Sequence, residues 1–218
     1  MSYELRNRIL TSLILTPVIF FTIYYGGVYL IALLSLIYFL SFYEIFKATK
    51  NLFFNISSSI VIIFALFSFY FLRGKNDYSL ITVYWILVAT FLSDIGGYIF
   101  GKIFGGKKLT KISPNKTYSG SIGSIIFCSV SLVFLNSSQE FFLNKNLIYF
   151  YQLKYFILTI CISIVCQFGD IYVSYWKRKF NIKNTSKILP GHGGVLDRID
   201  GLIFVLIFSF IVKIVGLI

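Results

Sequence analysis

Apolar residues along this chain are gathered into long runs, separated by short segments rich in polar residues and glycine. A helix needs roughly 20 mostly apolar residues to cross the hydrocarbon core of a bilayer. Because backbone groups in hydrocarbon must be hydrogen-bonded within their own segment, such runs predict transmembrane helices rather than barrel strands. Seven runs fit this pattern, the fifth being the shortest: Ile9–Tyr25, Val28–Phe46, Leu52–Leu72, Leu80–Phe100, Ser121–Leu135, Tyr155–Val173 and Leu202–Ile218.

The runs predict an all-α fold, a polytopic transmembrane helical bundle of about seven spans. Gly26-Gly27 provides the hairpin between the first two spans. Two arginines precede the first run, as in a signal peptide, but no small-residue cleavage site follows it and a second apolar run begins at once. We therefore expect residues 1–218 to form a single integral membrane domain, with N-terminal spans in 9–72 and a second half over 80–218.

The composition excludes a water-soluble domain. Hydrophobic residues make up 57% of the chain and charged residues 13%, whereas about 25% of the residues of a typical soluble globule are charged. A soluble fold of this size cannot hide so much apolar surface from water. The three cysteines, Cys128, Cys161 and Cys166, lie in apolar stretches without CxxC spacing, so we interpret them as small buried hydrophobic residues.

The charged residues are strongly unbalanced, with 20 Lys and Arg against 8 Asp and Glu, for a net charge of +12. In a soluble protein this excess would suggest a nucleic-acid partner. In a membrane protein it is explained by the positive-inside bias and by attraction to anionic head groups, so we expect membrane lipid as a partner and no nucleic acid. A basic surface also attracts phosphorylated substrates.

The basic residues also predict the orientation of the bundle. If the N-terminus is cytosolic and all seven runs span, 15 basic residues fall in cytosolic segments and four fall on the opposite side. Because basic residues accumulate on the cytosolic side, the N-terminus is predicted to be cytosolic. Two cytosolic loops, Gly101–Gly120 and Ser174–Gly201, then contain most of the polar residues that could carry chemistry.

Four of the eight acids lie near one plane of the membrane. Asp94 and Asp170 are near the cytosolic ends of the fourth and sixth spans, and Asp197 and Asp200 come just before the seventh. A carboxylate at the centre of a span costs about 2.5–3.5 kcal/mol, so it usually has a specific role. Each acid alone could pair with a Lys or Arg or cap a helix. Four acids that converge from three spans favour a divalent-metal site, and Mg²⁺ binds oxygen ligands of this kind.

The end of the sixth span places three polar side chains in a row. Asp170, Ser174 and Lys177 are spaced i, i+4 and i+7, which puts them on one face of a helix. A carboxylate, a hydroxyl and an ammonium in this order suit a metal and phosphate oxygens. The alternative is an amphipathic helix end with snorkelling cations, which explains Lys177 and its basic neighbours but leaves Asp170 unexplained.

A glycine-rich segment precedes the seventh span. Backbone N–H groups at Gly193 and Gly194 can approach an anion closely, and a helix start downstream adds a favourable dipole. His192, the only histidine, could orient a phosphate or transfer a proton, although a lone loop histidine is more often simply solvated. Asp197 and Asp200 are three residues apart and can jointly bind one metal ion.

The other cytosolic loop follows the fourth span. Gly96 and Gly97 near the end of that span are typical of close helix packing. The stretch Ser113-Pro114-Asn115-Lys116-Thr117 is suited to hold an anion with side-chain donors.

Together these residues resemble the phosphatidate cytidylyltransferase (CDP-diacylglycerol synthase) family. The C-terminal motif of that family reads Ser-x-x-Lys-Arg, then Lys-Asp, then Pro-x-His-Gly-Gly-x-x-Asp-Arg-x-Asp. It is matched here in order by Ser174, Lys177-Arg178, Lys183-Asn184, Pro190, His192, Gly193, Gly194, Asp197-Arg198 and Asp200. The likeness covers about the C-terminal half, including the segment from Asp94 to Gly123. Asn184 stands where the family usually has Asp, and Ser119 where it often has Glu.

The resemblance implies an enzyme of phospholipid biosynthesis in the bacterial inner membrane, with its active site facing the cytosol. It would condense CTP with phosphatidate to give CDP-diacylglycerol and pyrophosphate, with Mg²⁺ and a monovalent cation such as K⁺. A homodimer is also implied. The implied catalytic residues are Asp170, Ser174, Lys177, Asp197 and Asp200. The metal ligands would be Asp94, Asp170, Asp197 and Asp200. The substrate contacts would be Ser113, Lys116, Thr117, Arg178, His192, Gly193, Gly194 and Arg198, of which Lys116 and Arg198 are our candidates for stabilising the charge of the triphosphate.

Other functions predict other patterns. A transporter or channel would distribute acids through the depth of the bilayer, whereas the acids here cluster near one surface. A CDP-alcohol phosphotransferase would carry Asp-Gly-x-x-Ala-Arg, and here only Asp200-Gly201 matches it. CTP-dependent activation of an isoprenoid-type lipid phosphate stays open, because apolar surfaces select the lipid chain.

Overall fold

The computed structural model describes residues 3–143, 153–182, 184–186, 188–191 and 193–218. His192 and Lys183 of the predicted motif lie outside the described residues. Helices dominate the described part of the chain, which confirms the all-α prediction. They are α1 (Tyr3–Tyr25), α2 (Gly27–Ala48), α3 (Leu52–Arg73), α4 (Asp77–Phe104), α5 (Tyr118–Leu143), α6 (Leu153–Lys179) and α7 (Leu196–Ile214).

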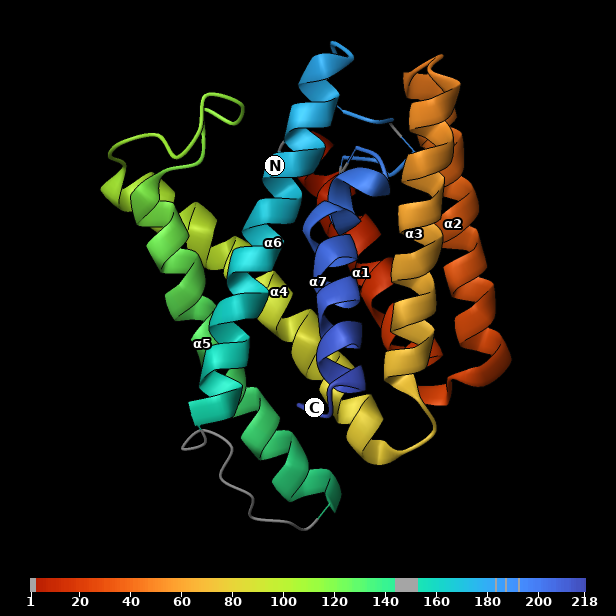
Figure 1. The fold of residues 1–218 in the computed structure, drawn as a ribbon, viewed down its shortest axis with the longest axis vertical. Coiled ribbons are helices and arrows are strands. Elements are labelled where there is room, and N and C mark those ends of the chain that lie inside the picture. The colour runs from red at the N-terminus through yellow and green to blue at the C-terminus, as the bar shows by residue number, and fades with distance from the viewer. Residues whose placement is uncertain (1–2, 144–152, 183, 187, 192) are drawn as a thin grey trace.

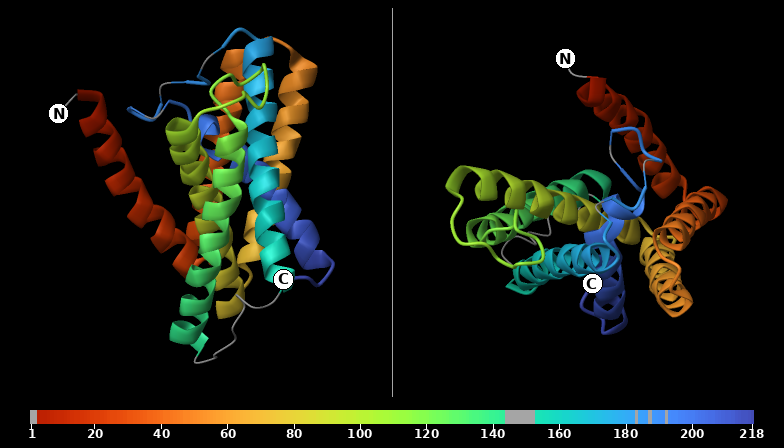
Figure 2. Two further views of the ribbon diagram at one scale, coloured as in Figure 1. Left: turned by 90° about the vertical axis from the view of Figure 1, so that its left-hand side faces the viewer. Right: turned by 90° about the horizontal axis from the view of Figure 1, so that it is seen from above.

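Helix α7 packs between α6 and α3, with α5 beyond α6 and α2 beyond α3, and α4 runs obliquely behind it (Figure 1). Helix α1 leans away from the remaining helices toward its N-terminal end (Figure 2). The segments 105–117 and 180–195 lie at the same end of the bundle as the turn between α2 and α3 (Figure 1). The two loops that the sequence placed on one side of the membrane therefore do share one end.

Five helices, α2 to α6, are long and apolar enough to cross a membrane. The described apolar part of α1, Ile9–Tyr25, is shorter. Helix α7 has 19 residues and includes four charged ones, Asp197, Arg198, Asp200 and Lys213. Length and composition thus support five of the seven predicted spans in the described part of the chain.

The helices extend past the apolar runs at the loop end of the bundle. Helix α4 continues to Phe104 and α6 to Lys179, and α7 begins at Leu196. The connecting segments are consequently shorter than the predicted loops Gly101–Gly120 and Ser174–Gly201. Basic residues in the last turns of α4 and α6 favour this extension, because cations stabilise the C-terminal ends of helices.

The predicted hairpin at Gly26-Gly27 is confirmed. Both residues have positive φ, +64° and +52°, which glycine adopts without steric cost. The buried Arg73 stabilises the turn from α3. Its Nε donates to the carbonyl of Ile23 and its Nη2 to that of Tyr24, both at 2.6 Å. These carbonyls belong to the last turn of α1, where backbone acceptors lack helical partners and a cation is favourable.

Glycines allow α4 and α5 to pack backbone against backbone. A Cβ placed on Gly96 would lie 2.6 Å from the Cβ of Phe127, and one on Gly120 would lie 2.8 Å from the carbonyl oxygen of Gly97. A Cβ on Gly123 would overlap the side chain of Phe100. Small residues permit this spacing in membrane helices, so the close-packing interpretation of Gly96 and Gly97 is confirmed.

A second glycine contact joins α6 to α7. A Cβ on Gly169 would lie 3.1 Å from both the Cα of Gly201 and the carbonyl oxygen of Asp200. On the facing side, a Cβ on Gly201 would lie 2.8 Å from Oδ1 of Asp170. This approach brings two of the predicted site carboxylates, Asp170 and Asp200, to one place.

Replacing Gly123 by leucine should force α5 away from α4. We expect Gly123→Leu to destabilise the folded protein by about 1–3 kcal/mol or more, because overpacking a tight contact displaces backbone. Val130→Leu, which adds bulk on an exposed part of the same helix, is the matched control. The measurement is the temperature at which each detergent-purified variant loses its monodisperse chromatographic peak. Equal losses in both variants would contradict the packing argument.

Candidate active site

A polar cavity opens between α4, α5, α6 and the 105–117 segment. It encloses about 800 Å³ of empty space, part of it open to solvent. Of this space, about 320 Å³ can hold the centres of water-sized molecules, which is at the lower end of the range of small-molecule sites. Its lining includes Asp94, Ser113, Lys116, Thr117 and Asp170, so the structure brings the predicted loop Gly101–Gly120 together with the acids near the ends of the fourth and sixth predicted spans.

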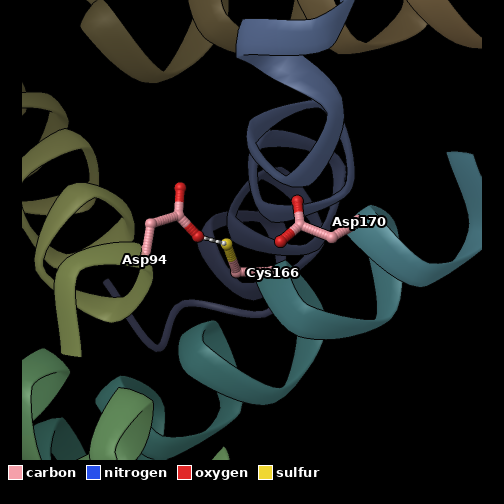
Figure 3. Close-up of side chains that lie close together, drawn as sticks. All are labelled: Asp94, Cys166 and Asp170. Carbon is pink, nitrogen blue, oxygen red and sulfur yellow. Dashed lines mark hydrogen bonds between the residues drawn. The ribbon is translucent and has the colours of Figure 1, made fainter. Parts of the chain in front are cut away.

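Two carboxylates meet across this cavity (Figure 3). Asp94 on α4 is exposed and Asp170 on α6 is half-buried, and both lie close to the buried Cys166. One ligand atom of each of the three residues falls within 4.8 Å of the others. Within the described residues, no other group of three potential metal-ligating acids, cysteines or histidines meets this condition.

Cys166 contributes a hydrogen bond to this group. Its Sγ donates to Oδ1 of Asp94 at 3.5 Å, as the dashed line in Figure 3 marks. Mg²⁺ takes oxygen ligands, whereas thiolates select softer metals. The chemistry of the donor set therefore fits Mg²⁺ at the oxygens of Asp94 and Asp170, with the thiol of Cys166 orienting Asp94.

Lys116 pairs with Asp170 from the opposite wall. Its Nζ lies 2.8 Å from Oδ2 of Asp170, and the two residues are 54 positions apart in the chain. Both side chains keep about a quarter of their surface accessible, 27% and 21%. The ammonium group is thus held at the cavity wall, where it can face an anionic ligand.

Asp197 and Asp200 form a second acidic pair around Lys177. The Nζ of Lys177 lies 3.0 Å from Oδ1 of Asp197 and 3.9 Å from Oδ2 of Asp200. The prediction that the two acids share a face of one helix is confirmed by this common partner. The four predicted carboxylates thus divide into two groups, each with its own lysine.

The two groups are close enough to act on each other electrostatically. Asp170 and Asp94 repel each other, and both repel Asp200. Arg198, exposed on α7, offsets part of the charge at Asp94. Like charge gathered in this way favours a bound cation, which is an independent reason why the carboxylates fit Mg²⁺.

Glu44 on α2 is a site residue that the sequence interpretation missed. Its side chain has 0% exposure. It accepts hydrogen bonds from four donors in the segment that leads into α7, which are Thr185 Oγ1 at 2.8 Å, Ser186 Oγ at 2.7 Å, Val195 N at 2.7 Å and Leu196 N at 2.9 Å. The signal was available, because Glu44 is an acid inside the apolar run Val28–Phe46, where a carboxylate usually has a specific role.

Asp197 takes further donors from the same segment. Its Oδ2 accepts from the backbone N–H of Thr185 at 2.9 Å and of Gly194 at 3.1 Å. Gly193 N donates instead to the carbonyl of Leu189 at 3.1 Å. The N–H groups of Gly193 and Gly194, predicted to bind a substrate anion, are therefore bonded to groups of the protein itself.

The remaining predicted residues lie at the same end of the bundle. Ser174 is half-buried on α6, between Asp170 and Lys177, and Arg178 is exposed near the end of that helix. Thr117 accepts a hydrogen bond from Gly120 N at 3.1 Å and so caps the start of α5.

The two residues that differ from the family motif, Ser119 and Asn184, have different surroundings. Ser119 donates a hydrogen bond to the carbonyl of Gly105 and thus ties the loop to α5. Asn184 is exposed at the start of the segment that Glu44 holds.

Comparison with known proteins gives matches to one family by sequence. The model of the cytidylyltransferase family matches residues 6–76 and 48–215. A phosphatidate cytidylyltransferase of Helicobacter pylori is 39% identical over 141 residues, covering 65% of this chain and 48% of that protein. One of Staphylococcus haemolyticus is 43% identical over 140 residues (63% and 50%), and one of Rickettsia conorii is 38% identical over 122 residues (56% and 53%).

The chain spans about half the length of these curated relatives. The family match, in contrast, extends from the first helix to the last and includes every described residue of the two acidic groups. The resemblance inferred from the motif residues is confirmed by it. The chain belongs to the cytidylyltransferase family.

Proposed function

We propose that this chain transfers the cytidylyl group of CTP to phosphatidate, giving CDP-diacylglycerol and pyrophosphate for phospholipid synthesis. The observation that carries the proposal is the polar cavity in which Lys116 and Asp170 pair beside Asp94. The names of the curated relatives, all phosphatidate cytidylyltransferases, support the choice of substrates.

The reaction needs no nucleophile from the protein. An oxygen of the lipid phosphate attacks the α-phosphorus of CTP, and a new phosphorus–oxygen bond forms as the bond to the oxygen bridging the α- and β-phosphates breaks. Pyrophosphate leaves with the bonding electron pair. The enzyme must align two anionic phosphates and neutralise their charge, which is the main requirement of phosphoryl transfer.

The charged residues of the site meet that requirement. Lys116 at the cavity wall and Lys177 between the two acids of α7 supply positive charge, while Ser113 and Thr117 add donors. Mg²⁺, together with a monovalent cation such as K⁺, would be held by Asp94, Asp170 and Asp200. When bound, Mg²⁺ neutralises charge on phosphate oxygens.

The role of Asp197 in this proposal is constrained by its hydrogen bonds. Both of its oxygens accept donors, Oδ2 from two backbone N–H groups and Oδ1 from Lys177. A carboxylate oxygen has two lone pairs, so Oδ1 retains one for a cation. We therefore propose that Oδ1 of Asp197 binds the metal ion while it keeps its contact with Lys177.

A second cavity suits the apolar part of the acceptor. It encloses about 560 Å³ of empty space between α2, α3, α6 and α7, and its lining is mostly apolar, with Phe54, Val61 and Ile203 among it. Trp176 and Leu196 also line it, and they are the neighbours in sequence of Lys177 and Asp197. A lipid chain in this cavity would keep its phosphate near those charged groups.

The proposal includes the membrane arrangement. All seven helices would span a bacterial inner membrane, with the N-terminus and the site facing the cytosol, where CTP is found. The gathering of basic segments at one end of the bundle supports this orientation. A homodimer, implied by the family resemblance, is kept as part of the proposal.

The activity is tested with labelled CTP and purified protein. We expect label to enter organic-extractable lipid only when both phosphatidate and Mg²⁺ are present. No product from phosphatidate, but product from an isoprenoid phosphate, would replace the proposed acceptor. No product with either acceptor would contradict the proposed function.

The carboxylates are tested by substitutions that preserve shape. Asp170→Asn and Asp197→Asn should each lower turnover by about 100-fold or more, the scale of losing charge stabilisation in the transition state. Expression and membrane insertion should be unchanged. Asp77→Asn is the control, because Asp77 is exposed in the first turn of α4, at the end away from the site. Near-normal turnover of both site variants at saturating Mg²⁺ would remove these residues from the mechanism.

The orientation is tested by labelling single introduced cysteines with a membrane-impermeant maleimide. We expect Lys111→Cys in the 105–117 segment to react only from the cytosolic side and Lys75→Cys, before α4, only from the opposite side. The unsubstituted protein gives the background, because its cysteines lie within α5 and α6. Labelling of both positions from one side would contradict the proposed topology.

A further inference from the structure

The carboxylate of Glu44 occupies the start of helix α7. Each of its oxygens accepts one hydroxyl and one backbone N–H: Oε1 accepts from Ser186 and Val195, and Oε2 from Thr185 and Leu196. The N-terminus of a helix presents unpaired N–H groups and a positive dipole end, so it is a natural site for an anion. Here the anion comes from α2, 151 and 152 positions away in the chain from its two backbone donors.

The same short segment also holds Asp197. Thr185 donates its hydroxyl to Glu44 and its backbone N–H to Asp197. Gly194 N donates to Asp197, and the next N–H, that of Val195, donates to Glu44. Because the two carboxylates share one turn and one threonine, a displacement of either carboxylate moves the donors of the other.

The position of Asp197 in turn fixes the position of Lys177, a charged group of the site. Its Oδ2 is fixed by the two backbone N–H groups, which leaves Oδ1 facing Nζ of Lys177 at 3.0 Å. Lys177 also lies 3.9 Å from Asp200. From these contacts we propose that Glu44 is a positioning residue, which sets the place of Asp197 and Lys177 for the transfer reaction; the proposal rests on the function proposed above.

The contact also explains why glycine is needed at position 194. A Cβ at Gly194 would lie 2.6 Å from Oε2 of Glu44 and would overlap Oγ1 of Thr185. The residue is buried, with its N–H bonded to Asp197. Gly194 therefore leaves room for Glu44 to reach the loop. This role differs from the substrate contact that the motif suggested.

Glutamine at position 44 is the sharpest test, because it keeps the shape of the side chain but replaces one of the two acceptor oxygens by an NH₂ donor. Two of the four donors are backbone N–H groups, which cannot accept a hydrogen bond. In either orientation of the amide, its NH₂ group would face one of these N–H groups and leave it unpaired. Ser41→Ala is the matched control, since Ser41 is equally buried on α2 and its hydroxyl has no hydrogen-bond partner among the described residues.

We expect Glu44→Gln to fold and to lower kcat by roughly 100-fold, while KM for CTP changes less than about threefold, because misplaced groups near the reacting atoms reduce turnover more than binding. Ser41→Ala should match the wild type. Hydrogen–deuterium exchange should rise in the peptide covering 184–196 and remain unchanged in α4 and α5.

Each other outcome is decisive. A wild-type protein that fails to incorporate CTP into lipid contradicts the proposed function, whereas an active wild type with an equally active, folded Glu44→Gln overturns the positioning role alone. A variant with reduced thermal stability but normal kcat would reduce Glu44 to a structural anchor. If Glu44→Gln yields no folded protein, Ser186→Ala removes one donor and leaves three: a lower kcat supports the proposal and an unchanged kcat overturns it.

Discussion

The close contact of α6 and α7 at Gly169 and Gly201 determines where the charged residues of the site can be. Because neither glycine has a Cβ, the two backbones can approach closely. A Cβ added to Gly169 would lie only 3.1 Å from the Cα of Gly201. Asp170 and Asp200 are the sequence neighbours of these glycines, so the same contact brings their carboxylates together. A larger residue at either position would separate the helices and with them the two acidic groups.

Bringing like charges together costs free energy, and the lysines offset that cost. Lys116 reaches Asp170 from the segment before α5, and Lys177 reaches Asp197 and Asp200 from the end of α6. In a partly buried setting, removing one partner of such a pair leaves an uncompensated charge. The lysines stabilise the folded arrangement, and in the proposed function the same two groups provide the positive charge that an anionic substrate needs.

The sequence predicts the helices well because the apolar runs are long. Their length alone indicates a helix, without any 3.6-residue periodicity in the pattern of apolar positions. It also predicts the Gly26-Gly27 hairpin and the close packing of α4. It predicts the helix ends poorly, since charged residues such as Lys179 and Asp197 continue a helix beyond its apolar run. The convergence of acids was predicted from their common membrane plane, but their division between two lysines was not, because pairs such as Lys116 with Asp170 leave no local pattern.

The contact of Glu44 with the start of α7 changes what the glycine-rich segment can be expected to do. Such a segment before a helix normally suggests that backbone N–H groups bind a phosphate. In this protein the N–H groups of Gly194, Val195 and Leu196 are bonded to two carboxylates of the chain itself. In the proposed function, contacts to substrate phosphates would then come chiefly from side chains, and the turn determines where those side chains are held. Helix α2, which carries no part of the motif, thereby contributes to the site through the buried Glu44.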